Sequence, residues 1–295
     1  MPVVHVAVLS DIHSNYHAFR ACYEDAVSRG AERFIFLGDY VSDLAEPDKT
    51  LDLLSEIREK FPAVCLLGNR ERYMLECKRG SCVFSPGSKS GSLFYTFHHL
   101  RPKDFQFFES LNPSDTIIIN GIPIEIAHAA MDDDRCFFDG DDSQTGTIFQ
   151  NMQHRYLLTG HSHKQYIRHQ GDKTIINPGS VGIPQDGTLW PKYALLRLSE
   201  DTISCQLRQV PYDRRDVIHA QFASGLVDVG KYWAIGALYD IINGKECVMT
   251  LLKQVEESGD VSDEECWDSA AARMGMAHTE EEIIDHLLKG ITIEI

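Results

Sequence analysis

The chain has 295 residues, of which 43% are hydrophobic and 24% charged, so it can bury a sizeable core. Its formal net charge of −16 argues against a protein that grips duplex nucleic acid, because such binding depends on clustered Lys and Arg. No stretch approaches the roughly 18 apolar residues of a membrane helix, so we expect no membrane partner.

Eight cysteines are scattered along the chain, without a CxxC pair or the spacing of a structural zinc site. We therefore expect free thiols in a reducing compartment. The first residues lack a basic leader and enter an apolar run that ends at Ser10, too soon for a secretory signal. Together these features predict a cytoplasmic protein.

The first part of the chain alternates strand and helix patterns. Residues 3–9 are apolar and β-branched and are followed by a helical pattern over residues 16–28. A second strand is predicted over residues 34–37, a helix over residues 49–60 and a third strand over residues 64–67. This alternation indicates βαβ units.

The middle of the chain is rich in strands. Asn120-Gly121 separates the apolar runs 116–119 and 122–127 and predicts a hairpin. Five further short strands are predicted, over residues 156–159, 165–169, 174–176, 193–198 and 202–210. A single parallel sheet cannot hold this many strands. We therefore predict an α/β (α+β) fold, a four-layer αββα sandwich of two mixed sheets flanked by helices.

Residues 212–295 form a predicted C-terminal helical extension to a domain of residues 1–211. Amphipathic helices are predicted over residues 245–257, 263–274 and 280–288. Four glycines break the apolar pattern and favour turns, at positions Gly225, Gly230, Gly236 and Gly244. The pair Tyr232-Trp233 is read as core, with stacking on a base as the alternative. The extension could cover a site, bind a second subunit or pack on the sheet.

Polar residues suited to binding a metal follow five apolar segments in the predicted sheets. They are Asp11 and His13, then Asp39, Asn69, His128, and finally His161 and His163. The carboxyl ends of strands are where α/β folds bind ligands. Each residue alone has an ordinary reading as a cap, a turn residue or a packed histidine, but their recurrence in this order favours a metal site. His98 and His99, in a predicted loop, are further candidates that could reach it.

Five motifs together resemble the calcineurin-like metallophosphoesterase signature over roughly residues 3–211. They are Asp11-x-His13, Gly38-Asp39, Gly68-Asn69-Arg70-Glu71, His128 and Gly160-His161-Ser162-His163. Residues 177–187 also look like a segment of the bacterial phosphodiesterase branch. The resemblance implies a hydrolase of phosphate esters or anhydrides acting on a small phosphorylated or nucleotide substrate.

The resemblance also implies two divalent ions. One would be held by Asp11, His13, Asp39 and His163, and the other by Asp39, Asn69, His128 and His161, with Asp39 as the bridge. Carboxylate and imidazole ligands suit manganese, iron or zinc. Two ions about 3.5–4 Å apart would activate a shared water as hydroxide for in-line attack on phosphorus. Asp39, Asn69 and Arg70 are the expected catalytic residues, with Asn69 and Arg70 on the phosphate.

Arg70 departs from the family pattern, in which a histidine after the asparagine is thought to protonate the leaving group. Arginine keeps its proton but suits bidentate contact with phosphate. General acid help is worth about 10²- to 10⁴-fold, so we expect a preference for good leaving groups such as aryl esters or nucleotide anhydrides. The alternative is a structural role for Arg70 in a salt bridge to Glu71 or Asp43.

Two readings of the function remain. The segment after Gly38-Asp39 lacks the arginine typical of the superfamily's protein phosphatases, which weakens that assignment. An active phosphohydrolase is favoured because all seven ligand types are present. A catalytically weak or inactive scaffold of the same fold that binds protein partners is the alternative, given the missing histidine and the helical extension. The sequence leaves a homo-oligomer open.

Overall fold

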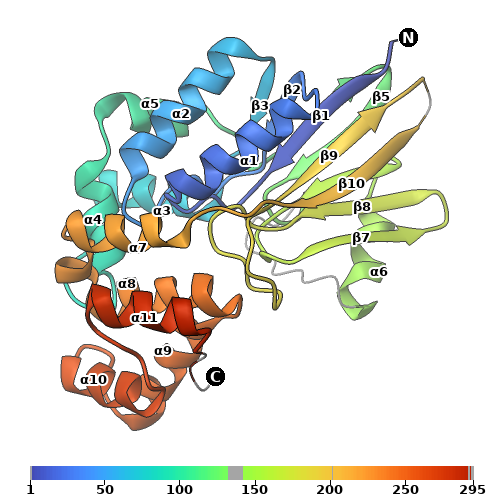
Figure 1. Ribbon diagram of the computed structural model, residues 1–295. Helices are drawn as coiled ribbons and strands as arrows, with labels where there is room; N and C mark the ends of the chain where they lie inside the picture. The colour runs from blue at the N-terminus through green and yellow to red at the C-terminus, as the bar shows by residue number, and fades with distance from the viewer. Residues whose placement is uncertain (1, 132–141, 201, 292, 294–295) are drawn as a thin grey trace.

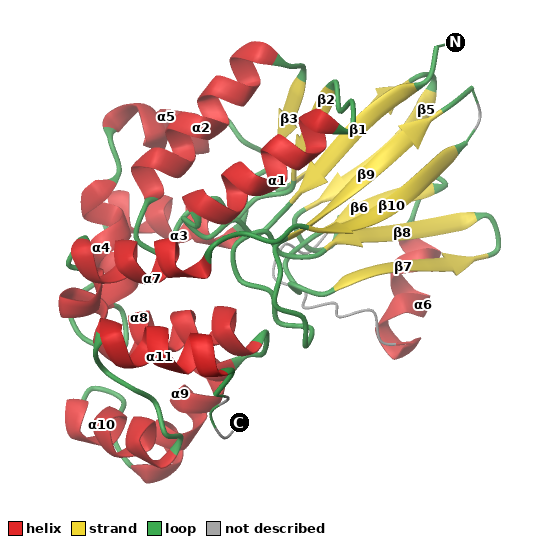
Figure 2. Ribbon diagram, in the orientation of Figure 1, coloured by secondary structure: helices red, strands yellow, loops and turns green. Residues whose placement is uncertain are grey.

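Two five-stranded sheets lie at the centre of the fold (Figures 1 and 2). The structure is a computed structural model, and it describes residues 2–131, 142–200, 202–291 and 293. The first sheet contains β1 (Val4–Leu9), β2 (Arg33–Phe36), β3 (Ala63–Cys65), β9 (Lys192–Leu198) and β10 (Ile203–Gln209). Its order is β10-β9-β1-β2-β3, with β1, β2 and β3 parallel and β9 antiparallel to both of its neighbours.

The second sheet is also mixed. It contains β4 (Ser114–Ile119), β5 (Ile122–Ala127), β6 (Tyr156–Thr159), β7 (Gln165–Gln170) and β8 (Lys173–Pro178). Its order is β4-β5-β6-β8-β7, in which β5, β6 and β8 are parallel and the two edge strands are antiparallel. The predicted Asn120-Gly121 hairpin joins β4 to β5, and both residues have positive φ, 51° and 78°, as the turn requires.

Alternating side chains of β1 pack into two different layers. Val6 and Val8 pack in the cluster between the two sheets, together with Ile124 of β5. Ala7 and Leu9, on the other face of the strand, pack in the cluster under the helices. Because successive strand residues face opposite sides, an apolar run without polar alternation predicts a strand that is buried on both faces.

Helices cover the outer faces of both sheets and confirm the four-layer sandwich. The first sheet is covered by α1 (Tyr16–Ser28), α2 (Pro47–Lys60), α3 (Asn69–Lys78) and α5 (Pro102–Glu109), while α4 (Gly91–His99) continues this layer toward the C-terminal helices. On the second sheet, α6 (Asp142–Asn151) packs through Phe149. The sequence patterns indicated α1 and α2 but not α3, α4 or α5.

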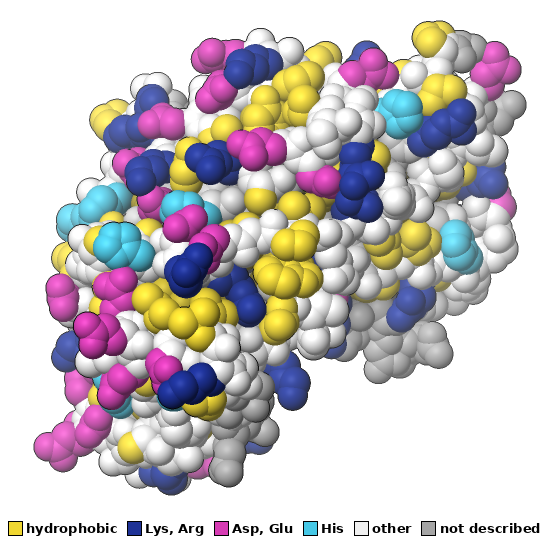
Figure 3. All heavy atoms as spheres, in the orientation of Figure 1, with side chains coloured by type: hydrophobic (Ala, Val, Ile, Leu, Met, Phe, Trp, Pro, Cys, Tyr) yellow, Lys and Arg dark blue, Asp and Glu magenta, His cyan; other side chains and the backbone are white. Residues whose placement is uncertain are grey.

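The C-terminal helices pack against the ends of these layers (Figure 1). They are α7 (Arg214–Ala223), α8 (Leu226–Asn243), α9 (Cys247–Ser258), α10 (Glu264–Arg273) and α11 (Glu280–Lys289). On the face shown in Figure 3, acidic side chains gather over this part of the molecule. Among the described residues, no helix is both long and apolar enough to cross a membrane.

The glycines of α8 correct one sequence expectation. Gly225 and Gly244 flank the helix, with φ of 79° and 65°. Gly236, expected in a turn, lies inside the helix instead, while Gly230 lies within α8 directly before a break at Lys231, whose φ of 44° and ψ of −124° are not helical. A Cβ at Gly230 would lie 2.8 Å from Ser92 Oγ, so this glycine permits close packing of α8 on α4 rather than a turn.

Candidate metal centre

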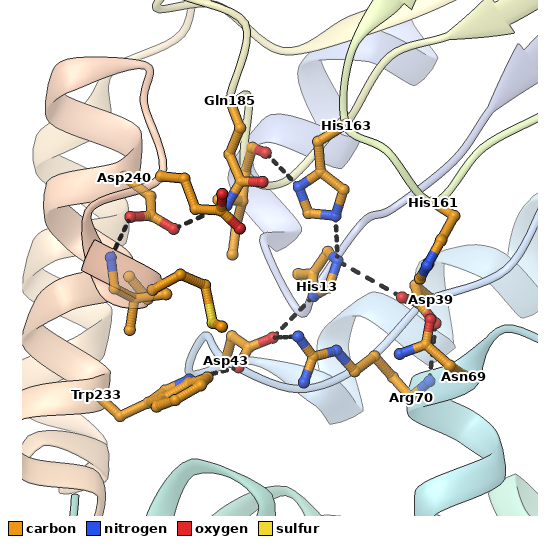
Figure 4. A pocket seen from close by; sticks show the side chains of 15 residues that line it. His13, Asp39, Asp43, Asn69, Arg70, His161, His163, Gln185, Trp233 and Asp240 are labelled. Atoms are coloured by element: carbon orange, nitrogen blue, oxygen red, sulfur yellow. Dashed lines mark hydrogen bonds and ion pairs between the residues drawn. The ribbon is translucent and has the colours of Figure 1, made fainter. Parts of the chain in front are cut away.

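The seven residues predicted as metal ligands lie together at the carboxyl ends of four strands and the first turn of α3. Figure 4 shows His13, Asp39, Asn69, His161 and His163. Asp11 and His13 follow β1, Asp39 follows β2, Asn69 begins α3, His128 follows β5, and His161 and His163 follow β6. Two groups of donor atoms stand out, each with its atoms within 4.8 Å of one another. They are Asp11, His13 and His163, and Asp39, His128 and His161.

The backbone at these positions is held in an unfavourable conformation. Positive φ angles occur at Asp11 (55°), His13 (49°), Asp39 (54°), His161 (66°) and His163 (57°). Non-glycine residues seldom adopt this region, and such strain clusters at functional sites where the surrounding fold enforces it. The loops after β1, β2 and β6 therefore aim these side chains at a cost in backbone energy.

Asp39 lies between the two groups. Its Oδ2 is 3.8 Å from His13 Nε2 and 3.5 Å from His128 Nε2. On one side, His13 Nε2 lies 3.1 Å from His163 Nε2. On the other, His128 Nε2 lies 3.0 Å from Asn69 Oδ1. A single carboxylate can thus reach the donor atoms of both groups.

Three of the histidines are oriented by oxygens on the far side of their rings. His128 Nδ1 lies 2.8 Å from the Leu37 carbonyl oxygen, and His163 Nδ1 lies 2.7 Å from that of Ile183. His13 Nδ1 lies 2.9 Å from an Asp43 carboxylate oxygen. When Nδ1 donates to an oxygen, Nε2 carries the lone pair that a metal needs. These rings therefore turn their Nε2 atoms into the site as metal ligands do.

The remaining chemistry of the donor set also fits a metal cation. Asp11 Oδ1 is buried and has no hydrogen-bond partner among the residues that the structure describes, which is costly for a carboxylate unless a cation compensates it. Burial and the positive charge of His128 lower the pKa of His161 to about 4, which keeps its imidazole neutral. Burial opposes the charge of His128, but Asp39 and Asp11 raise the pKa of His128 to about 9, so a metal would displace a proton from this ring. Burial opposes ionisation of Asp39, but His128 and His13 hold its pKa well below the ordinary value.

Asp43 is a site residue whose importance the sequence did not reveal. Besides its bond to His13, its carboxylate accepts hydrogen bonds from Ser42 Oγ at 2.9 Å and from Trp233 Nε1 at 2.9 Å. Arg70 lies 3.2 Å from the same carboxylate. Burial opposes its charge, but Arg70 and His13 keep the pKa of Asp43 low. Asp43 therefore fixes three side chains of the site at once (Figure 4).

Arg70 forms the salt bridge to Asp43 that the sequence left open as its structural role. The Arg70 side chain is still 22% exposed and lines the pocket beside Asn69. Glu71 has a different task, because its buried carboxylate accepts hydrogen bonds from the backbone N–H groups of Asp39, Tyr40 and Gly68. Glu71 thus ties the Asp39 loop to the start of α3.

The pocket at this centre is closed on one side by the C-terminal helices. It has a volume of about 190 Å³, and its far wall is formed by Gln185 with Trp233, Asp240, Glu246 and Met249. Trp233, expected in the core, is only partly buried and faces the pocket. Tyr232 and Trp233 both pack against the apolar cluster of the C-terminal helices, as expected, and Trp233 in addition turns its indole N–H to Asp43 across the pocket.

His98 and His99 do not reach the site. They lie in the last turn of α4 rather than in a loop, and their Nδ1 atoms bond the carbonyl oxygens of Phe94 and Tyr95, each at 2.8 Å. Both histidines are exposed on the helix.

All eight cysteines were expected to be free. The seven in the described part of the chain are, and Cys136 lies outside the described residues.

Comparisons with known proteins agree with this geometry. A family model described as the calcineurin-like phosphoesterase superfamily domain matches residues 4–201. An uncharacterised protein of Methanocaldococcus jannaschii is 25% identical over 225 residues, which cover 70% of this chain and 88% of that protein.

Two solved structures share the fold. A metallophosphoesterase from Sphaerobacter thermophilus superposes with a TM-score of 0.66 at 18% identity, covering 82% of this chain and all of that one. A hypothetical protein from Pyrococcus horikoshii gives a TM-score of 0.67 at 16% identity, covering 78% of this chain and 96% of that one. The superposition with the Sphaerobacter thermophilus protein covers more of this chain than the family model, which ends at residue 201.

Proposed function

This chain belongs to the calcineurin-like phosphoesterase superfamily and is a metal-dependent hydrolase of phosphoester bonds, and we propose that it uses two divalent ions to cleave phosphodiesters or nucleotide anhydrides. The position of Asp39, whose Oδ2 lies within 4 Å of His13 Nε2 and His128 Nε2, is the observation that carries this proposal. One carboxylate between two imidazole groups is suited to bridging two cations.

The ligand sets implied by the family resemblance are supported by the two groups of donor atoms. Asp11, His13, Asp39 and His163 would hold one ion, and Asp39, Asn69, His128 and His161 the other. Mixed nitrogen and oxygen donors suit manganese, iron or zinc. When bound, such a pair supplies charge for the phosphate oxygens and lowers the pKa of a water between them.

Arg70 and Asn69 would bind the substrate phosphate. The Asn69 side chain is set by the first turn of α3, and the Arg70 guanidinium is held over the pocket by Asp43. Arginine can neutralise charge on phosphate oxygens but cannot give up a proton to the leaving group. We therefore expect faster hydrolysis of aryl esters and anhydrides than of alkyl monoesters such as serine phosphate.

The test is hydrolysis of bis-p-nitrophenyl phosphate by the purified protein with added manganese. Asp39→Asn should reduce turnover by more than the roughly 10- to 100-fold typical of changes to residues that only support metal ligands. It should also lower the bound manganese measured after dialysis. Asp115→Asn, a matched change at an exposed residue of β4, should leave both unchanged.

One outcome would contradict the proposed function. If the wild-type protein binds manganese but turns over neither aryl esters nor nucleotides, the proposed cleavage of phosphodiesters or nucleotide anhydrides is wrong. The partner-binding scaffold would then be the better account of this chain.

A further inference from the structure

A second hollow continues from the metal pocket. It has a volume of about 270 Å³ and shares Arg70, Trp233 and Met249 with the pocket at the metal centre. Its other walls include Tyr73 of α3, Lys89 just before α4, and Ser92 and Leu93 in the first turn of α4. Each hollow alone is smaller than the roughly 300–1,000 Å³ of common small-molecule sites. The shared rim makes them two parts of one extended site.

The charge on the two sides of this extended site differs. On the side of the C-terminal helices stand Asp240 and Glu246. Asp240 is buried and accepts hydrogen bonds from the backbone N–H groups of Cys247 and Val248 and from Gln185 Nε2. Burial raises the pKa of Asp240 to about 8, so Glu246 supplies the negative charge on this side near neutral pH. On the other side stand the cations Arg70 and Lys89. An anionic part of a substrate is therefore directed toward the second hollow.

The second hollow also carries polar groups without partners. Ser92 is 2% exposed, and its Oγ has no hydrogen-bond partner within the described part of the chain. Arg70 Nε is likewise buried without one. Ser92 lies in the first turn of α4, which contains no acidic residue. The Gly91 N–H at the start of α4 already donates to the Gly87 carbonyl oxygen. The donors left for an anion are therefore the Ser92 hydroxyl and Arg70 Nε, and the positive end of the helix dipole adds to their attraction for it.

Aromatic side chains complete the hollow. Tyr73 and the partly buried Trp233 both line it. The Trp233 indole is fixed by its 2.9 Å bond to Asp43. A rigid aromatic wall can take the face of a base, which is worth about 1–3 kcal/mol per stacked base. Donors for an anion beside such a wall fit a nucleotide better than an aliphatic ester.

We propose that this hollow binds a second phosphate of a nucleotide substrate while the scissile phosphate lies at the metal centre. The proposal rests on the proposed function for the position of the scissile group. Lys89 and Ser92 would donate to the second phosphate, and Arg70 would lie between the two phosphates. The second phosphate can be joined to the first by an anhydride, as in ADP, or through a nucleoside, as in a dinucleotide with a 5′-phosphate.

Steady-state kinetics of two variants test the proposal. Lys89→Ala and Ser92→Ala are compared with wild type on bis-p-nitrophenyl phosphate, ADP and the dinucleotide pApA. We expect KM for at least one two-phosphate substrate to rise about tenfold in Lys89→Ala, the loss of one charge-assisted hydrogen bond. Turnover of bis-p-nitrophenyl phosphate should stay within twofold. Lys103→Ala, at an exposed residue of α5, is the matched control.

Comparing ADP with pApA distinguishes an anhydride linkage between the two phosphates from an ester linkage. A rise in KM for ADP alone assigns an anhydride, and a rise for pApA alone assigns an ester linkage. Unchanged KM for both substrates, or an equal loss on bis-p-nitrophenyl phosphate, would overturn the second phosphate site.

Binding provides a readout that does not depend on turnover. Quenching of tryptophan fluorescence by ADP should weaken in Lys89→Ala and disappear in Trp233→Phe, since Trp267 is fully buried and Trp190, the third tryptophan, lines neither hollow. If no substrate is hydrolysed but this quenching behaves as described, the hydrolase proposal fails and the second phosphate site stands. If ADP quenches Lys89→Ala as strongly as wild type, the second phosphate site fails.

Discussion

At the scale of single residues, Asp43 connects parts of the chain that are far apart in sequence. Its carboxylate contacts His13 after β1, Arg70 in α3 and Trp233 in α8. The contact with His13 fixes which ring nitrogen is free for a metal. The contacts with Arg70 and Trp233 fix the rim between the two hollows. One buried carboxylate thereby serves both the proposed metal site and the proposed substrate site.

Replacing this carboxylate should weaken metal binding without removing a ligand. We expect Asp43→Asn to lower manganese affinity by about 10- to 100-fold, because His13 loses its charged partner. Isothermal titration of the metal-free protein measures the change. An affinity equal to that of wild type would show that His13 is oriented without Asp43.

At the scale of an element, α8 contains a break that positions its aromatic residue. Lys231 has φ of 44° and ψ of −124°, a region favourable only for glycine. Just before it, Gly230 packs against Ser92 of α4, and two residues after it Trp233 reaches Asp43. The kink allows one helix both to pack on α4 and to turn an indole into the pocket. The fold tolerates the strained lysine for this geometry.

Relieving this strain should stabilise the protein. We expect Lys231→Gly to raise the free energy of unfolding by about 1 kcal/mol, at the lower end of the cost of such a conformation. The lost contact with Glu264, 3.9 Å away and partly exposed, should matter little. Lys253→Gly, at an exposed helical position of α9, should instead destabilise by about 1 kcal/mol. Urea denaturation compares the two, and a loss of stability in Lys231→Gly would contradict the strain argument.

At the scale of the whole molecule, residues on both sides of the predicted boundary at residue 211 pack against one another. Leu44 and Ile183, from the part before the boundary, belong to the same apolar cluster as the buried residues of α7 to α11. Gln221 Nε2 in α7 also donates to the backbone carbonyl oxygen of Asp43. Parts that bury their apolar side chains against one another lose that burial together.

We therefore predict that the chain unfolds in one cooperative calorimetric transition, with matching calorimetric and van't Hoff enthalpies. Leu44→Ala should shift this whole transition, since removing a buried leucine costs about 2–5 kcal/mol. Leu288→Ala, at a side chain that is 69% exposed, should shift it little. Two separated transitions, with only one moved by Leu44→Ala, would instead support an independently folding extension.

The amino-acid sequence by itself determined the strands, the βαβ units and the polar residues that follow each strand. These depend on local alternation and on chemistry at strand ends, which are written in neighbouring residues. It did not reveal α3 to α5, because α3 has little apolar periodicity and α4 and α5 are only 9 and 8 residues long, and missing α4 is why His98 and His99 were placed in a loop. The tertiary structure alone decided that Asp43 meets Trp233, 190 positions away, and that the second hollow opens between α3, α4 and α8. Such contacts depend on how whole elements pack, and no local pattern encodes them.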